Sequence, residues 1–171
     1  NRTVRQASVL DRAARIVRNL QTFARKRNTT RTTVDLNHVV AETLALRADE
    51  QRTANITLVD QLDAGLPHVF VDPHQIQQIL LNLVINAVDA IGRDGAIEIR
   101  AVGAGDCAVI TVANDGPTIA QHDLPHVFDR FHRIRGARAR SHEGTGIGLA
   151  LVTELVKLHG GEISVDSVEG Q

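Results

Sequence analysis

The stretch Gln78–Ala90 constrains the fold more than any other part of the sequence. Its apolar residues recur at helical spacing and form one broad stripe, which comprises Ile79, Leu80, Leu83, Val84, Ala87, Val88 and the following Ile91. This spacing predicts a helix that faces the protein core.

Two asparagines interrupt this apolar helix. Asn82 and Asn86 are one turn apart, so their side chains are expected on the same side of the helix. Asparagine is a mediocre helix former because its amide competes for backbone hydrogen bonds. Either these amides satisfy buried backbone groups nearby, or they face a polar ligand, and the helix alone leaves both interpretations open.

Size and charge exclude several classes of protein. The chain has 171 residues and a formal net charge of −1, which allows one good core, or a modest domain with an appended element. No basic tract stands out except the arginines at 133–140, so a nucleic-acid partner is not expected. No apolar run approaches a membrane span, and no signal peptide is evident, so we expect a soluble, cytoplasmic piece, while membrane attachment of the parent protein stays open.

The single cysteine, Cys107, cannot form an intramolecular disulfide and is consistent with a reducing compartment. Its place in a strand-like run predicts a small buried residue. Because the sequence starts inside a helical pattern and stops after a strand pattern, we expect a fragment of a longer protein.

Residues 4–27 form a long amphipathic pattern with arginines between the apolar positions. Such a helix cannot bury its stripe alone, so it is expected to pack in a helical bundle or dimer, or else to be a core helix of the same domain. The polar run at 25–33 is expected to be a linker.

The segment from 34 to 113 alternates strands and helices. Strands are expected at 34–36, 56–62 and 69–71, and helices are expected from Asn37, as its cap, toward Ala54 and from Asp72-Pro73 to Gly92. Residues 96–102 and 107–113 predict a hairpin. The predicted fold class is therefore α/β, a two-layer sandwich with one mixed sheet and helices on a single face.

The next part of the chain departs from this alternation. A Gly/Pro turn at 114–119 is the kind of place where backbone approaches a ligand, and 123–131 predicts a short capped helix. Residues 132–143 are rich in arginine and predict a mobile loop, which we expect to be protease-sensitive without ligand. Beyond the next helix, 162–167 predicts a last strand.

Alternating glycines in Gly144-Thr145-Gly146-Ile147-Gly148-Leu149 lead directly into a helix that extends to His159. Glycines before a helix N-terminus expose N–H groups and the positive end of the helix dipole, which suits phosphate. The same glycines are also compatible with tight packing alone. No Walker motif is present, since no Gly-Lys-Ser/Thr follows.

Together these motifs resemble the catalytic, ATP-binding domain of sensor histidine kinases, within the superfamily that includes gyrase-type ATPases. The segment 82–87 is similar to the N box of that family, Phe128-Asp129-Arg130-Phe131 to its F box, and 144–149 to its G2 box. The resemblance covers residues 34–171 and implies the Bergerat-type ATP-binding fold. It implies a division into 1–28, part of the dimerisation and phosphotransfer hairpin, and 29–171, the catalytic domain with its C-terminus truncated.

The resemblance also implies roles for individual residues. Asn86 is expected to bind Mg²⁺ through its amide oxygen. Asn82 stands where gyrase-type relatives carry a water-activating glutamate, and an amide cannot serve as that base. The expected catalytic residues are thus Asn82 and Asn86, and the expected ATP-binding residues are Asn86, Asp89, Asn114, Gly116, Phe131, Arg133, Gly144, Thr145, Gly146, Gly148 and Leu149.

Two departures from the family pattern are evident. The G1 box of the family reads Asp-x-Gly-x-Gly, with its aspartate on the adenine amino group, whereas this chain has Asn114 and Thr118 in place of the aspartate and the second glycine. Asp115 does not restore the match, because a shifted register puts Pro117 where a glycine is needed. In addition, no His-Glu phosphoacceptor box precedes the first helix.

The function implied is transfer of the ATP γ-phosphoryl group to a histidine absent from this chain. The expected partners are ATP, a phosphoacceptor helix of the same or a partner chain and a response regulator receiver domain, with homodimerisation in the full-length protein. The alternative is a degenerate module with impaired ATP binding, suggested by Asn114. A gyrase-like ATPase is disfavoured by Asn82.

Overall fold

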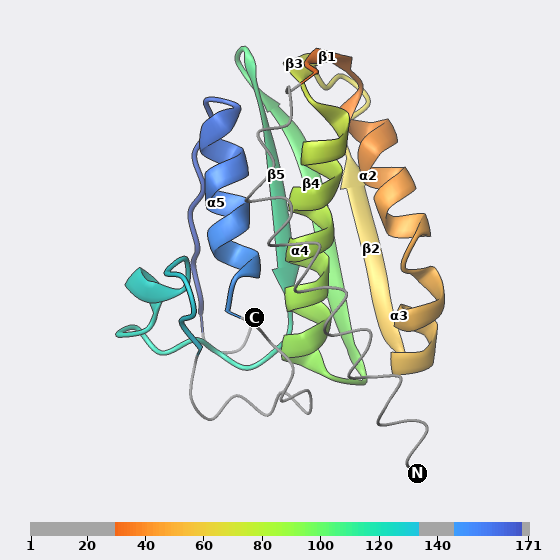
Figure 1. Ribbon diagram of the computed structural model, residues 1–171. Helices are drawn as coiled ribbons and strands as arrows, with labels where there is room; N and C mark the ends of the chain where they lie inside the picture. Colours follow the sequence, from red (N-terminus) through yellow and green to blue (C-terminus); the bar gives the residue numbers. More distant parts are fainter. Residues whose placement is uncertain (1–29, 134–145, 169–171) are drawn as a thin grey trace, which may run out of the picture.

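The computed structural model describes residues 30–133 and 146–168 (Figure 1). The amphipathic helix predicted over 4–27, and most of the predicted arginine-rich loop, lie outside these residues. The boundary predicted after residue 28 lies outside them as well.

The described elements form an open sheet with helices on one face, as predicted. In chain order they are β1 (Thr32–Val34), α2 (Leu36–Ala45), α3 (Ala48–Ala54), β2 (Ile56–Leu62), β3 (Val69–Val71), α4 (Pro73–Ile91), β4 (Gly95–Ala104), β5 (Cys107–Asn114), the 3₁₀ helix η1 (Leu124–His126) and α5 (Gly148–Leu158). Figure 1 shows α5, α4 and the pair α2–α3 side by side in front of the sheet.

The sheet is mixed, which confirms the predicted fold class. Its strand order is β2-β4-β5, in which β2 pairs with β4 in parallel and β4 pairs with β5 antiparallel. The short strands β1 and β3 form a separate antiparallel ribbon, with Thr33 opposite Phe70.

Helix α4 is the centre of the core because it contributes to two apolar clusters. On one side Leu80, Val84 and Ala87 pack against the inward-facing Ile97 and Ile99 of β4. The other side of the helix packs against α5, in a cluster made of Ile79, Leu151, Val152 and Leu155. The broad stripe predicted from the sequence is thus divided between the sheet and α5.

The start of α2 differs from the prediction. Asp35 is the cap, since its Oδ1 accepts the backbone N–H groups of Asn37 at 2.9 Å and His38 at 3.4 Å. The Asn37 side chain instead donates to the carbonyl oxygen of Asp63 at 2.9 Å. The single helix predicted toward Ala54 was also wrong: Arg47, with φ −120° and ψ 6°, separates α2 from α3.

Two other predicted elements are shorter or absent. Only η1 forms within 123–131, and the side chain of its cap residue Asp123 makes no capping hydrogen bond. Residues 162–167 alternate between exposed and half-buried positions but carry no strand assignment. A period of two reports which face is covered, whereas a strand also requires a hydrogen-bonded neighbour.

Two smaller expectations also fail. Cys107 is exposed because it opens β5 directly after the hairpin turn, so the prediction of a buried residue was wrong. Thr32 and Thr33, assigned to the linker, pair with β3. No helix in the described part of the chain has both the length and the apolar character needed to span a bilayer.

Candidate functional site

Helix α4 carries the two asparagines toward α5. Its N-terminus is fixed by Asp72, whose Oδ1 accepts the N–H groups of His74 at 3.0 Å and Gln75 at 3.4 Å, and Pro73 occupies the first helical turn. Asn82 is only 6% exposed, and Asn86 is half-buried. The helix therefore presents two amides at a largely covered surface.

The two amides have different partners. Asn82 Nδ2 donates to the carbonyl oxygen of Gln78 at 2.8 Å, so the predicted backbone-satisfying role applies to this NH₂ group. Asn86 Nδ2 has no exposed surface and no hydrogen-bond partner among the described residues. A buried unpaired amide costs free energy, so its retention favours the second interpretation, a polar ligand.

Gly148, the first residue of α5, lies against both amides. A β-carbon added to Gly148 would be 3.5 Å from Asn82 Oδ1, 3.6 Å from Asn86 Nδ2 and 3.7 Å from Asn86 Oδ1. The preceding residue, Ile147, supplies no side-chain capping bond. The first N–H groups of α5 therefore receive no side-chain cap from Ile147, and they lie near the amides of α4. The helix dipole favours an anion at this position.

Gly146 joins this region to the predicted F box. Its carbonyl oxygen accepts the backbone N–H of Phe131 at 2.8 Å. Arg130 makes an exposed ion pair with Glu154 of α5 at 3.6 Å. The two predicted motifs, distant in sequence across residues 134–145, are thus brought together.

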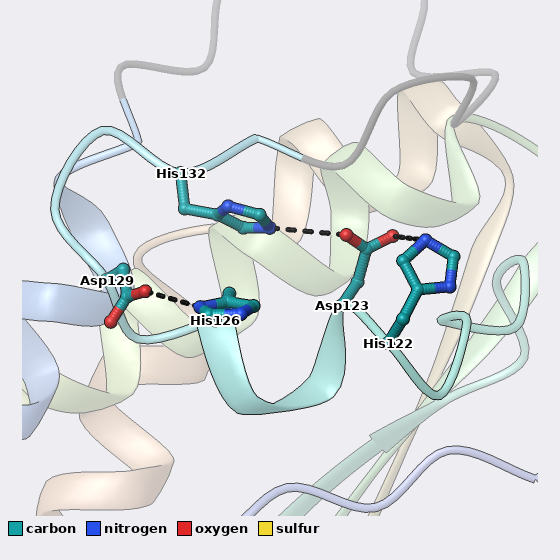
Figure 2. Close-up of polar contacts among 5 residues, drawn as sticks. All are labelled: His122, Asp123, His126, Asp129 and His132. Atoms are coloured by element: carbon teal, nitrogen blue, oxygen red, sulfur yellow. Dashed lines mark hydrogen bonds and ion pairs between the residues drawn. The ribbon is translucent and has the colours of Figure 1, made fainter.

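Histidine–aspartate contacts link residues within the segment 122–132 (Figure 2). Asp123 faces two histidines, with Oδ2 3.6 Å from His122 Nε2 and Oδ1 3.5 Å from His132 Nε2. His126 Nδ1 lies 2.8 Å from Asp129 Oδ2. Sequence reasoning missed these contacts, although the density of histidine and aspartate in 122–132 was a visible signal.

The predicted G1 segment follows β5 and lies near the C-terminal end of α4. Asn114 is exposed, and its Nδ2 would lie 2.6 Å from a β-carbon on Gly116. The same β-carbon would be 3.2 Å from the Ala90 side chain of α4. A glycine is needed here because the chain passes close to the helix.

Asp115 has a structural role. Its Oδ1 accepts the backbone N–H of Ala96 at 2.9 Å and leaves no room for a side chain at Gly95, where a β-carbon would be 2.5 Å away. The Asp115 carboxylate is therefore held at the end of β4 and does not take the place of the missing G1 aspartate.

The remaining predicted residues are placed unevenly. Asp89 lies on α4 beyond Asn86, half-buried, and Leu149 lies half-buried in the first turn of α5. Arg133 is exposed at the end of the described segment. Gly144 and Thr145 lie outside the described residues, so their predicted roles stay predictions.

These features define a class of protein: an α/β domain in which the N-terminus of one helix faces a polar patch on its neighbour, as a phosphate-binding site requires. Residues 71–171 match the family described as Histidine kinase-, DNA gyrase B-, and HSP90-like ATPase. The chain belongs to this family, and within it is the ATP-binding catalytic domain of a histidine kinase.

Individual relatives agree with this assignment. Sensor histidine kinase ZraS of Salmonella typhimurium is 34% identical over 166 residues, which are 96% of this chain and 34% of that protein. The catalytic domain of histidine kinase ThkA is 28% identical with a TM-score of 0.72, covering 82% of this chain and 89% of that one. ThkA in complex with response regulator protein TrrA gives 25% identity and a TM-score of 0.78, covering 95% and 46%. The chain spans about a third of the length of the curated relatives it matches.

Proposed function

We propose that the domain binds Mg²⁺ and ATP between α4 and α5 and directs the γ-phosphoryl group to a histidine on a helix of the same or a partner chain. The observation that carries this proposal is the buried, unpartnered Asn86 amide beside Gly148. A ligand with several oxygen atoms would satisfy both this amide and the N–H groups at the start of α5.

The described residues can offer Mg²⁺ one protein ligand, an amide oxygen. An amide oxygen is a hard ligand, and Mg²⁺ is commonly held by few protein groups together with substrate phosphates. The described residues contain no group of three His, Cys, Asp or Glu side chains that could hold a metal ion. Asn86 Oδ1 would thus be the ligand from this chain, and the ion, when bound, would neutralise phosphate charge.

Asn82 limits the reaction with water. Its NH₂ is committed to Gln78, and an amide oxygen cannot accept a proton as a general base. The bound γ-phosphoryl group would therefore be reserved for a better-positioned nucleophile. This argues against a gyrase-like ATPase and in favour of phosphotransfer.

At the other end of the site, we propose that Asn114 faces the base and Gly116 lets the ligand approach α4. Asn114 is exposed and adjoins Gly116. An amide offers both a donor and an acceptor to a base, whereas a carboxylate only accepts. Asp89, Phe131, Arg133, Gly144, Thr145, Gly146 and Leu149 are proposed to complete the nucleotide site.

The partners follow from the same proposal. The ThkA complex contains the response regulator TrrA, and we propose a receiver domain as partner here. Residues 1–28 would belong to a dimerisation and phosphotransfer hairpin, and the whole protein would act as a homodimer with this domain in the cytoplasm. Neither the family match nor the relatives support the degenerate module.

Calorimetric titration of the chain with a non-hydrolysable ATP analogue tests the proposal. Binding is expected with Mg²⁺ and is expected to weaken when the ion is chelated. Absence of binding at millimolar analogue with Mg²⁺ present would overturn the proposal and restore the degenerate module.

A further inference from the structure

The first two described residues, Thr30 and Arg31, contact two helices that are far away in sequence. The Thr30 N–H donates to Asp72 Oδ2 at 3.2 Å. Arg31 Nη2 donates to the carbonyl oxygen of Leu158, the last residue of α5, at 2.7 Å. Adjacent residues thus bind the beginning of α4 and the end of α5.

Asp72 uses its two oxygens for two different tasks. Oδ1 caps α4 through His74 and Gln75, while Oδ2 accepts from Thr30. Asp72 is buried at 8% exposure. A displacement of Thr30 would therefore break its hydrogen bond to the residue that caps α4, the helix that carries Asn82 and Asn86.

Arg31 binds α5 where the helix most favours a cation. The last carbonyl groups of a helix lack intrahelical partners and lie at the negative end of its dipole. The Arg31 guanidinium satisfies one of them. A displacement of Arg31 would therefore break its hydrogen bond to the C-terminus of α5, the helix that begins at Gly148.

His159 packs into the same junction. Both of its ring nitrogens are buried without a partner among the described residues. Burial and the nearby Arg31 lower the pKa of His159, while Asp72 opposes this. A neutral imidazole leaves the Asp72 carboxylate to Thr30 and His74.

The two helices run antiparallel (Figure 1), and α5 packs against the part of α4 around Ile79. Thr30 and Arg31 contact the N-terminus of α4 and the C-terminus of α5. The N-terminus of α5 lies at the other end of that helix, beside the asparagines of α4. We propose that Thr30 and Arg31 form a latch that sets the relative position of α4 and α5. Arg31 is then a positioning residue for the nucleotide site.

This inference rests on the proposed function, because the latch acts on the site formed by Asn86 and Gly148. Coupling of this kind is reciprocal, so nucleotide bound between α4 and α5 also stabilises the latch. The physical basis is two packed helices joined at one end by two hydrogen bonds.

The test compares Arg31→Gln and Arg31→Lys with a matched control, Arg52→Gln, in the 171-residue chain. Arg52 is exposed and lies 3.9 Å from Asp49 on α3, away from the latch. Hydrogen exchange is measured across α5 without nucleotide, and the Kd for Mg²⁺ with an ATP analogue is measured in parallel.

With Arg31→Gln, faster exchange is expected at both ends of α5, including Leu151, whose N–H donates to the carbonyl oxygen of Ile147, together with a Kd increase of about fivefold. Arg31→Lys is expected to fall between this variant and the wild type, because it keeps the positive charge but loses the planar donor group. Arg52→Gln should change neither quantity. Should Arg31→Gln fail to fold, the intermediate effect of Arg31→Lys decides the question.

Faster exchange confined to the last turn of α5, with an unchanged Kd, would overturn the latch and leave Arg31 as a local cap. If the wild-type chain binds no nucleotide, the proposed function fails on its own. The latch is then judged by exchange of the Leu151 N–H, where a rise supports the latch and no change overturns it.

Discussion

The backbone N–H of Phe131 donates to the carbonyl oxygen of Gly146 at 2.8 Å, and both residues have positive φ, 65° and 66°. For a non-glycine residue such as Phe131 this backbone conformation is uncommon and costs free energy. Phe131 is nevertheless 71% exposed. The geometry at this point is therefore maintained by the contact between the two motifs and not by burial of the ring.

Gly146→Ala should disrupt this junction. A β-carbon at Gly146 would lie 2.8 Å from the Phe131 backbone, and the left-handed conformation alone costs about 1–2 kcal/mol for a residue with a side chain. We expect weaker nucleotide binding and a lower midpoint of denaturant unfolding, measured by calorimetry and circular dichroism.

Gly103→Ala is the matched control, since its β-carbon would meet only Pro67 Cδ at an ordinary 3.5 Å. It should resemble the wild type. If Gly146→Ala behaved like this control, the contact between the F and G2 motifs would have no energetic importance.

Asn86→Ala should weaken Mg²⁺-dependent nucleotide binding about tenfold or more, which corresponds to about 1.4 kcal/mol. Asn86→Asp should have the same effect, because a carboxylate removes the NH₂ donor and adds a charge that repels phosphate. Both variants should stay folded, since Asn86 Nδ2 has no partner to lose within the described residues. Calorimetry measures binding, and circular dichroism measures folding.

Gln61→Ala, which removes an exposed amide on β2, provides the control for this substitution. Unchanged binding in both Asn86 variants would show that the amide does not contact the ligand complex.

Asn114→Asp should strengthen ATP binding and increase the preference for ATP over GTP. A carboxylate can only accept, so it favours the adenine amino group and opposes the guanine O6, whereas an amide can rotate to pair with either base. The regained charge-assisted bond is worth about 1–2 kcal/mol. Titrating both nucleotides against both proteins measures the affinity and the ratio.

Two results are separable in this titration. An unchanged ATP/GTP ratio would contradict the selectivity argument, and an unchanged ATP affinity would contradict impaired base recognition. Either of these unchanged values would indicate that water molecules around the base compensate for the substitution.

His159 should make stability fall in mild acid. Its pKa is lowered in the folded state from the ordinary value of 6.5, by burial first and by Arg31 second, against Asp72. Below pH 6.5 the unfolded chain therefore binds more protons at this residue than the folded chain. The loss of stability begins near pH 6.5 and levels off below the folded-state pKa.

His159→Gln should reduce this pH dependence, measured as the free energy of unfolding at pH 7.5 and pH 5.5. His68→Gln, at an exposed position before β3, should retain the wild-type pH dependence. Equal pH profiles for His159→Gln and the wild type would show that His159 is not the group responsible.

The sequence was informative where a local rule decides the structure. The stripe on 79–91 predicted α4, the Asp72-Pro73 pair predicted its start, and the glycines at 103–106 predicted the β4–β5 hairpin. The N, F and G2 motifs indicated the family that the comparisons confirm. Capping chemistry misled at α2, because Asp35 and Asn37 are both suitable caps and only the contact of Asn37 with Asp63 distinguishes them.

Tertiary structure alone decided which polar groups meet. Spacing placed Asn82 and Asn86 on one face, but only the folded structure shows that the Asn82 NH₂ donates to Gln78 while the Asn86 NH₂ is buried unpaired beside Gly148. Likewise, no local pattern joins Arg31 to Leu158, or Asp115 to Ala96. These contacts link residues far apart in the chain, and their geometry is set by the packing of α4 against α5 and the sheet, which sequence periodicity does not encode.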